Sequence, residues 1–569
     1  MTIPDIRTIR VDDIPLLLGI MKQMGIQEGI DEYIKPHGLW QGISVGTIVV
    51  IWLSYILTTQ DHRLEPVQRW VNARRELFNQ LLEIELRPTD LTDDRLANVL
   101  TMLGKEDTQA LLDGHWNQTW ITMYELPTEV TRYDSTTVSV YQDADGREAS
   151  ILGHGFSKDH RPDLAQFKVM LASLGMGMPL TCQVVYGKCA DDGLYVPAYE
   201  SVVKTLGHAN FLGVGDSKMA AWETRQTFAV GGSWYLCPYR GTAAKGDETE
   251  SWIETALQKK GELLEVTRTD EKTGEIITIA SVHEWSRQQT TQDEIGNAVQ
   301  WTERVLVSHS PALQKGMLTC RQHSEQRLFQ LLEKLRRPPK RGQKRYRTEA
   351  ELQKEVDGLL KKHHMSDIIA VKLIGHPHTD KGYRWVVDAY QRQPEAWQKM
   401  VDRLGWGVYL SNAPVFAYST AQLIHTYRQQ PHLERGISYL KSRYLHIRPV
   451  FLHDQQRIVG LTWLLILALR VMMLTEFQAR RQLAQHNESI RGLKVGSPNT
   501  ATQRPTAEKM FAAFEGINWT LVSLEDTQHA HITPLNDTQK HILRLLDLPD
   551  ALYARLGYTK PKPLLNLRE

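Results

Sequence analysis

Apolar residues at helical spacing dominate the first part of the chain. After Ser44, which could cap a helix, Ile48, Ile51, Tyr55 and other apolar residues recur at the spacing of one buried helix face. The same i, i+3, i+4, i+7 pattern follows Thr92. The uncharged stretches at 38–60 and 458–469 are too polar or too short for a membrane span, which needs about 20 predominantly apolar residues. We therefore expect buried core helices in both places.

The period changes at about residue 130, where β-branched and aromatic residues become frequent. Three neighbouring strands, then a helix, then further strands predict a mixed α/β sheet. The predicted strands are 130–141, 167–172, 179–186, 211–216 and 234–239, with a helix at 194–206 between the third and the fourth.

Short polar strands at 264–268, 276–282 and 304–309 precede a basic helical run, and strand character returns at 406–412. A helical region then extends to about 480, and a short helical tail ends the chain. We expect five regions: a helical DNA-binding or dimerisation domain (1–125), a first part of a catalytic core (126–240), an insertion (241–400), a second part of the core (401–480) and a helical C-terminal region (481–569).

Composition narrows the class of protein only modestly. The chain of 569 residues is 41% hydrophobic and 23% charged, as in folded multidomain proteins, and its formal net charge is +1. A DNA-binding surface would therefore require local segregation of charge. The four cysteines form no CxxC pair, which favours neither a zinc ribbon nor a disulfide framework. The N-terminus holds acids and no early apolar run, unlike a signal peptide, so we expect a cytoplasmic protein.

Two aspartates occupy positions where an acidic side chain is unusual and needs a chemical explanation. Asp134 interrupts an otherwise apolar and hydroxylic strand, where a charged residue needs a partner or a metal. Asp216 ends the next strand but two, at the edge where α/β sheets usually bind ligands. For either residue alone a structural cap or turn is equally reasonable. Together on one sheet they favour a metal site, because hard ions such as Mg²⁺ prefer carboxylate oxygens.

A third carboxylate, Glu434, lies in a segment with a seven-residue spacing. Tyr427, Glu434 and Lys441 would share one face of a continuous helix, so that Glu434 could ligate a metal while Tyr427 and Lys441 meet phosphates. Pro431 would kink that helix or start a new one. An exposed helix with ordinary charged residues is the alternative interpretation.

These segments together resemble the DDE transposases of bacterial insertion sequences, in the branch with a β-rich insertion before the catalytic Glu. The resemblance is carried by Tyr133-Asp-Ser-Thr, by the block from Gly155 to Lys168, by Gly215-Asp-Ser and by the segment from Tyr427 to Lys441. Gln430 stands where the family signature has an arginine, with Arg428 two residues before it. Asp216 follows Asp134 by 82 residues and Glu434 follows Asp216 by 218 residues, and the second spacing leaves room for the insertion.

The resemblance implies a ribonuclease H-like core in which Asp134, Asp216 and Glu434 are the catalytic residues and hold two Mg²⁺ ions, for which Mn²⁺ could substitute. It further implies a nucleoid-associated protein that binds the terminal inverted repeats of its element as a homodimer in a paired-end complex. DNA would be cleaved to free a 3′ hydroxyl, which then attacks target DNA. Tyr427, Arg428 and Lys441 would contact this DNA.

A basic run from Lys334 to Arg347 holds eight cationic residues and no acid. A solvated loop and a contact with DNA phosphates are equally reasonable interpretations. We expect Lys340, Arg341, Lys344 and Arg345 to bind the DNA backbone.

Three alternatives remain at the level of sequence. A relative could keep the nuclease chemistry without transposing, and only inverted repeats flanking the gene would separate it from a transposase. A non-catalytic DNA-binding protein would have no use for three acids among phosphates. A zinc enzyme is suggested by His363-His364 and by His376-Pro-His378, but no HExxH motif accompanies them, and solvated histidines explain them better.

Overall fold

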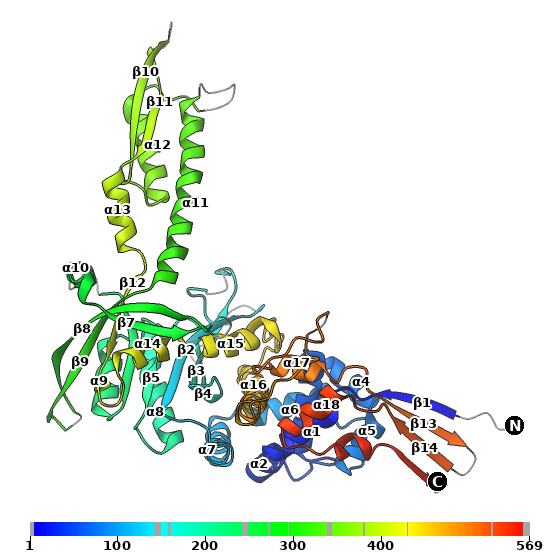
Figure 1. Cartoon of the computed structure of the whole chain (residues 1–569). Helices are drawn as coiled ribbons and strands as arrows, with labels where there is room; N and C mark the ends of the chain where they lie inside the picture. Colours follow the sequence, from blue (N-terminus) through cyan, green and yellow to red (C-terminus); the bar gives the residue numbers. More distant parts are fainter. Residues whose placement is uncertain are drawn as a thin grey trace. The chain divides into compact units, whose positions relative to one another are not determined.

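The computed structural model divides the chain into two compact units. The first unit comprises Met1–Tyr235 and Tyr427–Glu569, and the second comprises Leu236–Thr426. The structure describes residues 5–141, 150–157, 161–241, 248–270, 274–293, 295–337, 344–378, 382–429, 431–494, 496–524 and 527–561. Figure 1 follows the elements along the chain, and each unit is described separately below.

Helices build the N-terminal part of the first unit, as expected for residues 1–125. They are α1 (Ile14–Gln23), α2 (Ile26–Tyr33), α3 (Val45–Thr59), α4 (Glu65–Asn72), α5 (Arg75–Leu82), α6 (Asp93–Leu103) and α7 (Glu106–Met123). The predicted cap of α3 is confirmed, because the Ser44 hydroxyl accepts a hydrogen bond from the Thr47 amide at 3.1 Å. A strand that the pattern did not predict, β1 (Asp5–Arg10), precedes these helices.

A mixed sheet follows and confirms the predicted α/β class. Its strands in the first unit are β2 (Val130–Ser139), β3 (Gln166–Leu174), β4 (Pro179–Tyr186) and β5 (Leu212–Val214), in the order β4-β3-β2-β5. The pairs β4–β3 and β3–β2 are antiparallel, whereas β2 and β5 are parallel. A short 3₁₀ turn η1 (Asp192–Leu194), α8 (Tyr195–Leu206) and α9 (Trp222–Val230) complete this part. A parallel pair requires a crossover, which the segment containing α8 provides.

The longest helix, α16 (Gln455–Gln485), forms the centre of the first unit. Most of its residues are buried, and it packs against α3, α6 and β4. Among the described residues it is the one helix long and apolar enough to cross a membrane, but 94% of its most apolar window is buried inside the protein. The expected core helices at 458–469 and 38–60 are thus confirmed as parts of α16 and α3, whose residues Val45–Leu57 are buried.

The C-terminal region corrects the expectation of a helical tail. Besides α17 (Ala507–Ala512), α18 (Asp537–Leu545) and α19 (Ala551–Ala554), it holds β13 (Asn518–Leu524), β14 (Thr527–Ile532) and β15 (Tyr558–Pro561). These strands form a sheet with β1 in the order β1-β13-β14-β15. The prediction missed them because β14, Thr-Gln-His-Ala-His-Ile, has little apolar signal, and because β13 pairs with β1 from the other end of the chain.

Antiparallel strands form the base of the second unit. From Leu236 on, β6 (Trp234–Tyr239) pairs with β12 (Trp406–Ser411), and β9 (Ala298–His309), β8 (Ile276–Gln292) and β7 (Leu264–Thr269) follow in that order. The helix α10 (Glu248–Gln258), the 3₁₀ turn η2 (Lys260–Glu262) and most of α14 (Thr420–Arg428) also belong to this unit.

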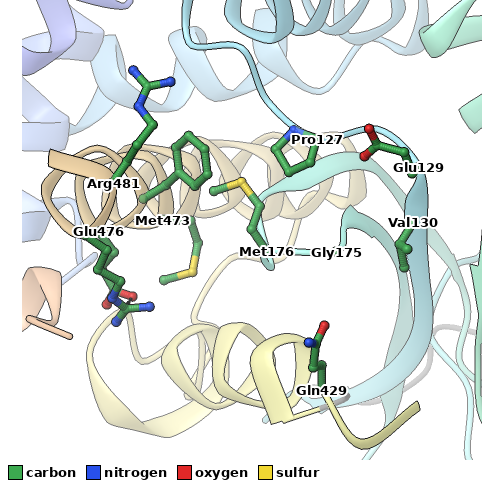
Figure 2. Close-up of a pocket in the computed structure, with 11 residues that line it drawn as sticks. Pro127, Glu129, Val130, Gly175, Met176, Gln429, Met473, Glu476 and Arg481 are labelled. Carbon is green, nitrogen blue, oxygen red and sulfur yellow. Dashed lines mark ion pairs between the residues drawn. The ribbon is translucent and has the colours of Figure 1, made fainter. Parts of the chain in front are cut away.

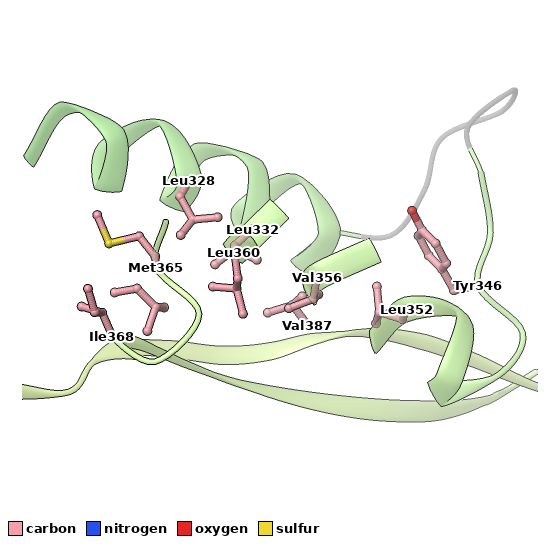
Figure 3. Packing of buried hydrophobic residues seen from close by; sticks show 10 residues of the cluster. Leu328, Leu332, Tyr346, Leu352, Val356, Leu360, Met365, Ile368 and Val387 are labelled. Atoms are coloured by element: carbon pink, nitrogen blue, oxygen red, sulfur yellow. The ribbon is translucent and has the colours of Figure 1, made fainter. Parts of the chain in front are cut away.

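A helical layer and a hairpin form the rest of the second unit. The helices α11 (Pro311–Arg336) and α12 (Glu349–Lys362) lie beside the hairpin of β10 (Ile369–His378) and β11 (Gly382–Arg392), and α13 (Pro394–Arg403) follows (Figure 1). Leu328, Leu332, Val356 and Val387 are among the residues of their shared core (Figure 3). The region expected to be β-rich is therefore mixed, because apolar positions at helical spacing in α11 and α12 cover one face of the hairpin.

Candidate active site

Asp134 lies midway along β2, and Asp216 follows the end of the neighbouring parallel strand β5 by two residues. The ladder pairs Val130 with Leu212, Thr131 with Gly213 and Arg132 with Val214. Continued by two residues, this register sets Asp134 beside Asp216. Neighbouring strands are about 4.8 Å apart, and residues in register on parallel strands point to the same face of the sheet. The sheet therefore directs both carboxylates toward one place.

The Asp216 carboxylate is held through one of its oxygens. The Tyr195 hydroxyl, from the first turn of α8, donates a hydrogen bond to Asp216 Oδ1 at 2.7 Å. The backbone amide of Lys218 donates to the same oxygen at 2.8 Å. Asp134 Oδ1 accepts from the amide of Ser135 at 2.8 Å. Both aspartates are partly buried, so their charges are only partly screened by water.

The electrostatics of Tyr195 connect the two aspartates. Burial raises the pKa of the Tyr195 hydroxyl well above its usual value, and the negative charges of Asp216 and then of Asp134 raise it further. A phenolate would add a third negative charge to this group, so the hydroxyl stays protonated and remains a donor. Tyr195 thus lies in the electric field of both carboxylates.

Gly215 leaves space for the side chains of Tyr195 and Met219 next to Asp216. A Cβ atom at residue 215 would lie 2.7 Å from Met219 Sδ and 3.0 Å from Tyr195 Cε1. Any larger residue would therefore push the tyrosine ring away from the strand end. The Gly-Asp sequence is explained by the close approach of Tyr195, which sequence reasoning did not identify.

Glu434 lies on α15 (Pro431–Ser438), which packs against β2, the strand that carries Asp134. Its side chain is exposed. Across the described ranges, no group of three or more His, Cys, Asp and Glu side chains is arranged to hold a metal ion. The structure therefore brings Asp134 and Asp216 together and places the helix of Glu434 beside them, while the three-carboxylate site stays a prediction.

The continuous helix through Tyr427, Glu434 and Lys441 is not observed. Tyr427 lies on α14, which ends at Arg428, a new helix α15 begins at Pro431, and Lys441 lies in a π-helical turn, η3 (Tyr439–Arg443). The sequence accounts for the break, because proline lacks an amide donor and is favoured in the first turn of a helix over its interior. Gln430 lies outside the described residues. The phosphate contacts of Tyr427, Arg428 and Lys441 remain predictions.

Arg435, the neighbour of Glu434, belongs to a buried charge cluster that the sequence did not reveal. Glu476 of α16, which is 1% exposed, forms ion pairs with Arg435 and, at 2.7 Å, with Arg480. Its other oxygen accepts a hydrogen bond from the Ala507 amide at 3.0 Å. Desolvation raises the pKa of Glu476 in spite of the two arginines. This cluster fastens α15 to α16.

Glu476 and Arg480 also line a pocket of about 550 Å³ (Figure 2). Pro127, Glu129, Val130, Gly175, Met176, Gln429, Met473, Phe477 and Arg481 complete its wall. The pocket lies at the start of β2, whereas Asp134 lies four residues further along that strand. It is therefore separate from the aspartate pair.

The block from Gly155 to Lys168 is described except for residues 158–160. Gln166 donates to the carbonyls of Phe156 and Gly187 at 3.1 and 3.0 Å, which fixes the entry to β3. Lys168 is buried and forms an ion pair of 2.5 Å with Asp191. These contacts give the block a structural role in holding the sheet edge.

The basic run of the second unit is described only in part. Lys340 and Arg341 lie outside the described residues. Lys344 and Arg345 are exposed, and Lys344 lies 3.4 Å from Glu355. Lys334, Arg337 and Lys344 line a second pocket of about 190 Å³ together with Leu335, Tyr346, Trp385 and Val386. Three of the described cations thus line one pocket, and contact of the run with DNA stays a prediction.

The histidines behind the zinc alternative make ordinary contacts where they are described. His363 Nδ1 lies 3.1 Å from the Ser324 hydroxyl, and His364 and His376 have no acidic or cysteine neighbours grouped with them for a metal in the described chain. The side chain of His378 lies outside the described ones.

Comparison with known proteins adds one finding for the N-terminal region. Residues 6–114 match a family model described as a domain of unknown function (DUF4277). This range extends from β1 to the middle of α7. The search of curated proteins found no matching relative. The match concerns the helical region and leaves the aspartate pair to be interpreted from its own chemistry.

Proposed function

We propose that this chain is a transposase of a bacterial insertion sequence, which binds the terminal inverted repeats of its element and catalyses metal-dependent cleavage and strand transfer of DNA. The observation that carries the proposal is the register of β2 and β5, which sets Asp134 beside Asp216. Two partly buried carboxylates repel each other unless a cation lies between them. Their pairing therefore supports a cation-binding site.

The residues present suit a hard divalent ion. Asp134 and Asp216 offer carboxylate oxygens, the donors that Mg²⁺ prefers, and Mn²⁺ accepts the same set. Glu434 would supply the third carboxylate from α15. When bound, such ions offset negative charge on the phosphodiester oxygens and make water a stronger nucleophile. Tyr195 and the Lys218 amide hold Asp216 from the other side of its carboxylate.

The topology of the first unit supports a ribonuclease H-like core as part of this proposal. Three antiparallel strands, β2, β3 and β4, are followed by α8 and by β5, which is parallel to the first of them. Asp134 lies within β2, and Asp216 follows the end of β5. The second unit enters the chain between Asp216 and Glu434, as the resemblance to DDE transposases implies.

DNA would be bound by residues outside the aspartate pair. Tyr427, Arg428 and Lys441 flank α15 and are assigned to phosphates near the cleaved bond. Lys344 and Arg345, together with Lys340 and Arg341, are assigned to backbone contacts of the second unit. A homodimer would hold two element ends in one paired-end complex in the bacterial cytoplasm, associated with the nucleoid.

The test uses the full chain and duplex DNA that carries the inverted repeats flanking its gene. In Mg²⁺ the wild-type chain should cleave the element ends, free a 3′ hydroxyl and join it to a target duplex, as read on sequencing gels. Asp134→Asn and Asp216→Asn should abolish both steps and leave end binding intact. Asp192→Asn, which removes an exposed carboxylate next to α8, is the matched control and should retain full activity.

The other outcomes separate the alternatives. Cleavage without joining would indicate a nuclease relative that no longer transposes. Binding of the ends without cleavage by the wild-type chain, or cleavage that survives Asp216→Asn, would overturn the proposal.

A further inference from the structure

We infer that Tyr195 is a positioning residue of the metal site: its hydroxyl fixes the Asp216 carboxylate so that Oδ2 faces the cation. The inference rests on the proposed function and deepens it. Nothing in the sequence motifs singles out Tyr195, which lies 21 residues before Asp216.

Asp216 accepts two hydrogen bonds through the same carboxylate oxygen. The Tyr195 hydroxyl at 2.7 Å and the Lys218 amide at 2.8 Å both donate to Oδ1. Hydrogen bonds to an ionised acceptor are about twice as strong as neutral ones. With Oδ1 occupied twice, rotation of the carboxylate would break both bonds. Oδ2 is thereby directed away from Tyr195 and Lys218.

The tyrosine itself has little freedom to move. Its side chain is 1% exposed, and its ring lies 6.4 Å from the ring of Tyr133, centroid to centroid. The ring also touches the backbone position of Gly215, where a Cβ would approach to 3.0 Å. Packing on both sides holds the hydroxyl at Asp216, so the residue orients the carboxylate before any cation binds. Such pre-arranged support is what ligand positioning requires.

The neutral hydroxyl of Tyr195 is a suitable donor for positioning a metal-binding carboxylate. An arginine or lysine in this place would neutralise Asp216 and weaken its attraction for a cation. A neutral hydroxyl satisfies Oδ1 and leaves the full negative charge of the carboxylate available. A tyrosine hydroxyl is neutral at physiological pH, so it can donate this hydrogen bond without adding charge to the site.

The same helix offers a matched control. Tyr199, one turn further along α8, is also buried, and its hydroxyl lies 3.0 Å from the Ser233 hydroxyl. Tyr199→Phe removes one buried hydroxyl from the same helix without touching Asp216. Tyr195→Phe removes the hydroxyl at Asp216 and keeps the ring that packs against Gly215. A general effect of losing a buried hydroxyl would appear in both variants.

The experiment measures binding of Mn²⁺ to the full chain without DNA, by the electron paramagnetic resonance signal of free Mn²⁺. Loss of a residue that supports a metal ligand typically weakens affinity 10- to 100-fold. Tyr195→Phe should therefore raise the dissociation constant by at least about 10-fold, while Tyr199→Phe should leave it within about 2-fold of wild type. The Mg²⁺ concentration for half-maximal cleavage should shift by the same factor.

The outcomes separate this inference from the proposed function. Loss of Mn²⁺ binding in Asp216→Asn would support the metal site. If binding is then unchanged in Tyr195→Phe, or weakens equally in Tyr195→Phe and Tyr199→Phe, the role of Tyr195 is refuted and the metal site stands. If wild type shows no Mn²⁺ binding that depends on Asp216, the proposed function itself fails. Thermal unfolding checks that both variants are folded.

A measurement on the wild-type chain covers the case in which Tyr195→Phe does not fold. With 3-fluorotyrosine incorporated, bound Mn²⁺ should broaden the ¹⁹F resonance of residue 195 beyond detection, because that hydroxyl contacts a metal ligand. A resonance of residue 195 that stays sharp at saturating Mn²⁺ would overturn the inference.

Discussion

Arg470 of α16 and Asp113 of α7 form an ion pair in the core of the first unit, with Arg470 Nη1 2.6 Å from Asp113 Oδ1. The arginine is fully buried, and its other nitrogens donate to the carbonyls of Pro179 and Leu180 at 3.0 and 2.7 Å. One guanidinium therefore joins α16, α7 and the start of β4.

Arg470→Met should destabilise the first unit strongly. The substitution leaves Asp113 without its counter-charge and two carbonyls without donors, and breaking a buried pair in this way costs about 3–5 kcal/mol. Urea unfolding followed by circular dichroism measures the change. Arg161→Met, at an arginine that is 45% exposed, is the control and should leave the unfolding free energy unchanged. Equal midpoints for Arg470→Met and wild type would contradict this account.

Asp13 should make stability fall as the pH rises toward neutrality. Burial and, to a smaller extent, the charge of Asp12 raise the pKa of Asp13 from 3.8 to about 7, although the Thr58 hydroxyl donates a hydrogen bond to it and Arg74 is near. Between these two values the folded chain binds a proton that the unfolded chain releases. This contribution to stability is therefore full below about pH 4 and is lost as the pH rises through about 7.

Asp13→Asn should remove that dependence. The difference in unfolding free energy between variant and wild type should change by up to about 1.4 kcal/mol per pH unit between pH 5 and 7, in favour of the variant at the higher pH. Urea titrations at pH 5, 6, 7 and 8 measure it. Parallel pH profiles for the two proteins would show that Asp13 is not the group responsible.

Glu476→Gln should loosen α15 and lower cleavage without lowering DNA binding. The substitution removes the charge that holds Arg435 and Arg480, and hydrogen bonds to charged groups contribute about 1.5–3 kcal/mol. Hydrogen exchange in peptides that cover α15 should become faster, as measured by mass spectrometry. The control Glu488→Gln removes a carboxylate paired with Arg544 outside this cluster and should change neither property. Unchanged exchange in α15 would count against the fastening role of Glu476.

The aspartate pair should behave as one unit in kinetics. Since both carboxylates are required to hold the cation, Asp134→Asn combined with Asp216→Asn should lower cleavage no further than either change alone. Single-turnover cleavage of element ends in Mg²⁺ measures this. Losses that multiply in the double variant would indicate that the two residues act independently.

The basic run should set the salt dependence of DNA binding. Each lost phosphate contact lowers the slope of log affinity against log salt by about 0.9, so Ala at Lys340, Arg341, Lys344 and Arg345 should flatten it by up to about three units. The change should be nearly the same on element ends and on random duplexes, because phosphates carry little sequence information. Fluorescence anisotropy at several salt concentrations measures it, with exposed Lys105→Ala as the control. A slope equal to wild type would identify a solvated loop.

Local patterns predicted the strands of the central sheet well, because each strand is itself rich in the apolar and β-branched residues that suit a buried sheet. β4 and β6 have the predicted bounds, Pro179–Tyr186 and Trp234–Tyr239, and α8 begins one residue after its predicted start. The sequence also predicted the two strands near the aspartates, although β5 ends at Val214, two residues before Asp216. Their register, by contrast, depends on the pairing of strands that lie 82 residues apart, which no local pattern contains.

Contacts between distant residues explain what the sequence could not predict. Arg470 ends the uncharged apolar run in the sequence, yet it is fully buried within α16, because Asp113 and two carbonyls satisfy its guanidinium. Tyr195 carries no motif, and its role becomes visible only through its distance to Asp216. β1 is recognisable only by its pairing with β13.

Because the first unit consists of two separate chain segments, its two parts emerge from the ribosome at different times. When Tyr235 leaves the exit tunnel, the helix α16 that fills the centre of this unit is still about 250 residues from completion. At about 5–20 residues per second, that interval is on the order of 10–50 s. During that time α3 and α6 lack α16, the helix against which their apolar faces pack in the folded protein. The second unit is continuous in sequence and can fold meanwhile, so the first unit is begun first and completed last.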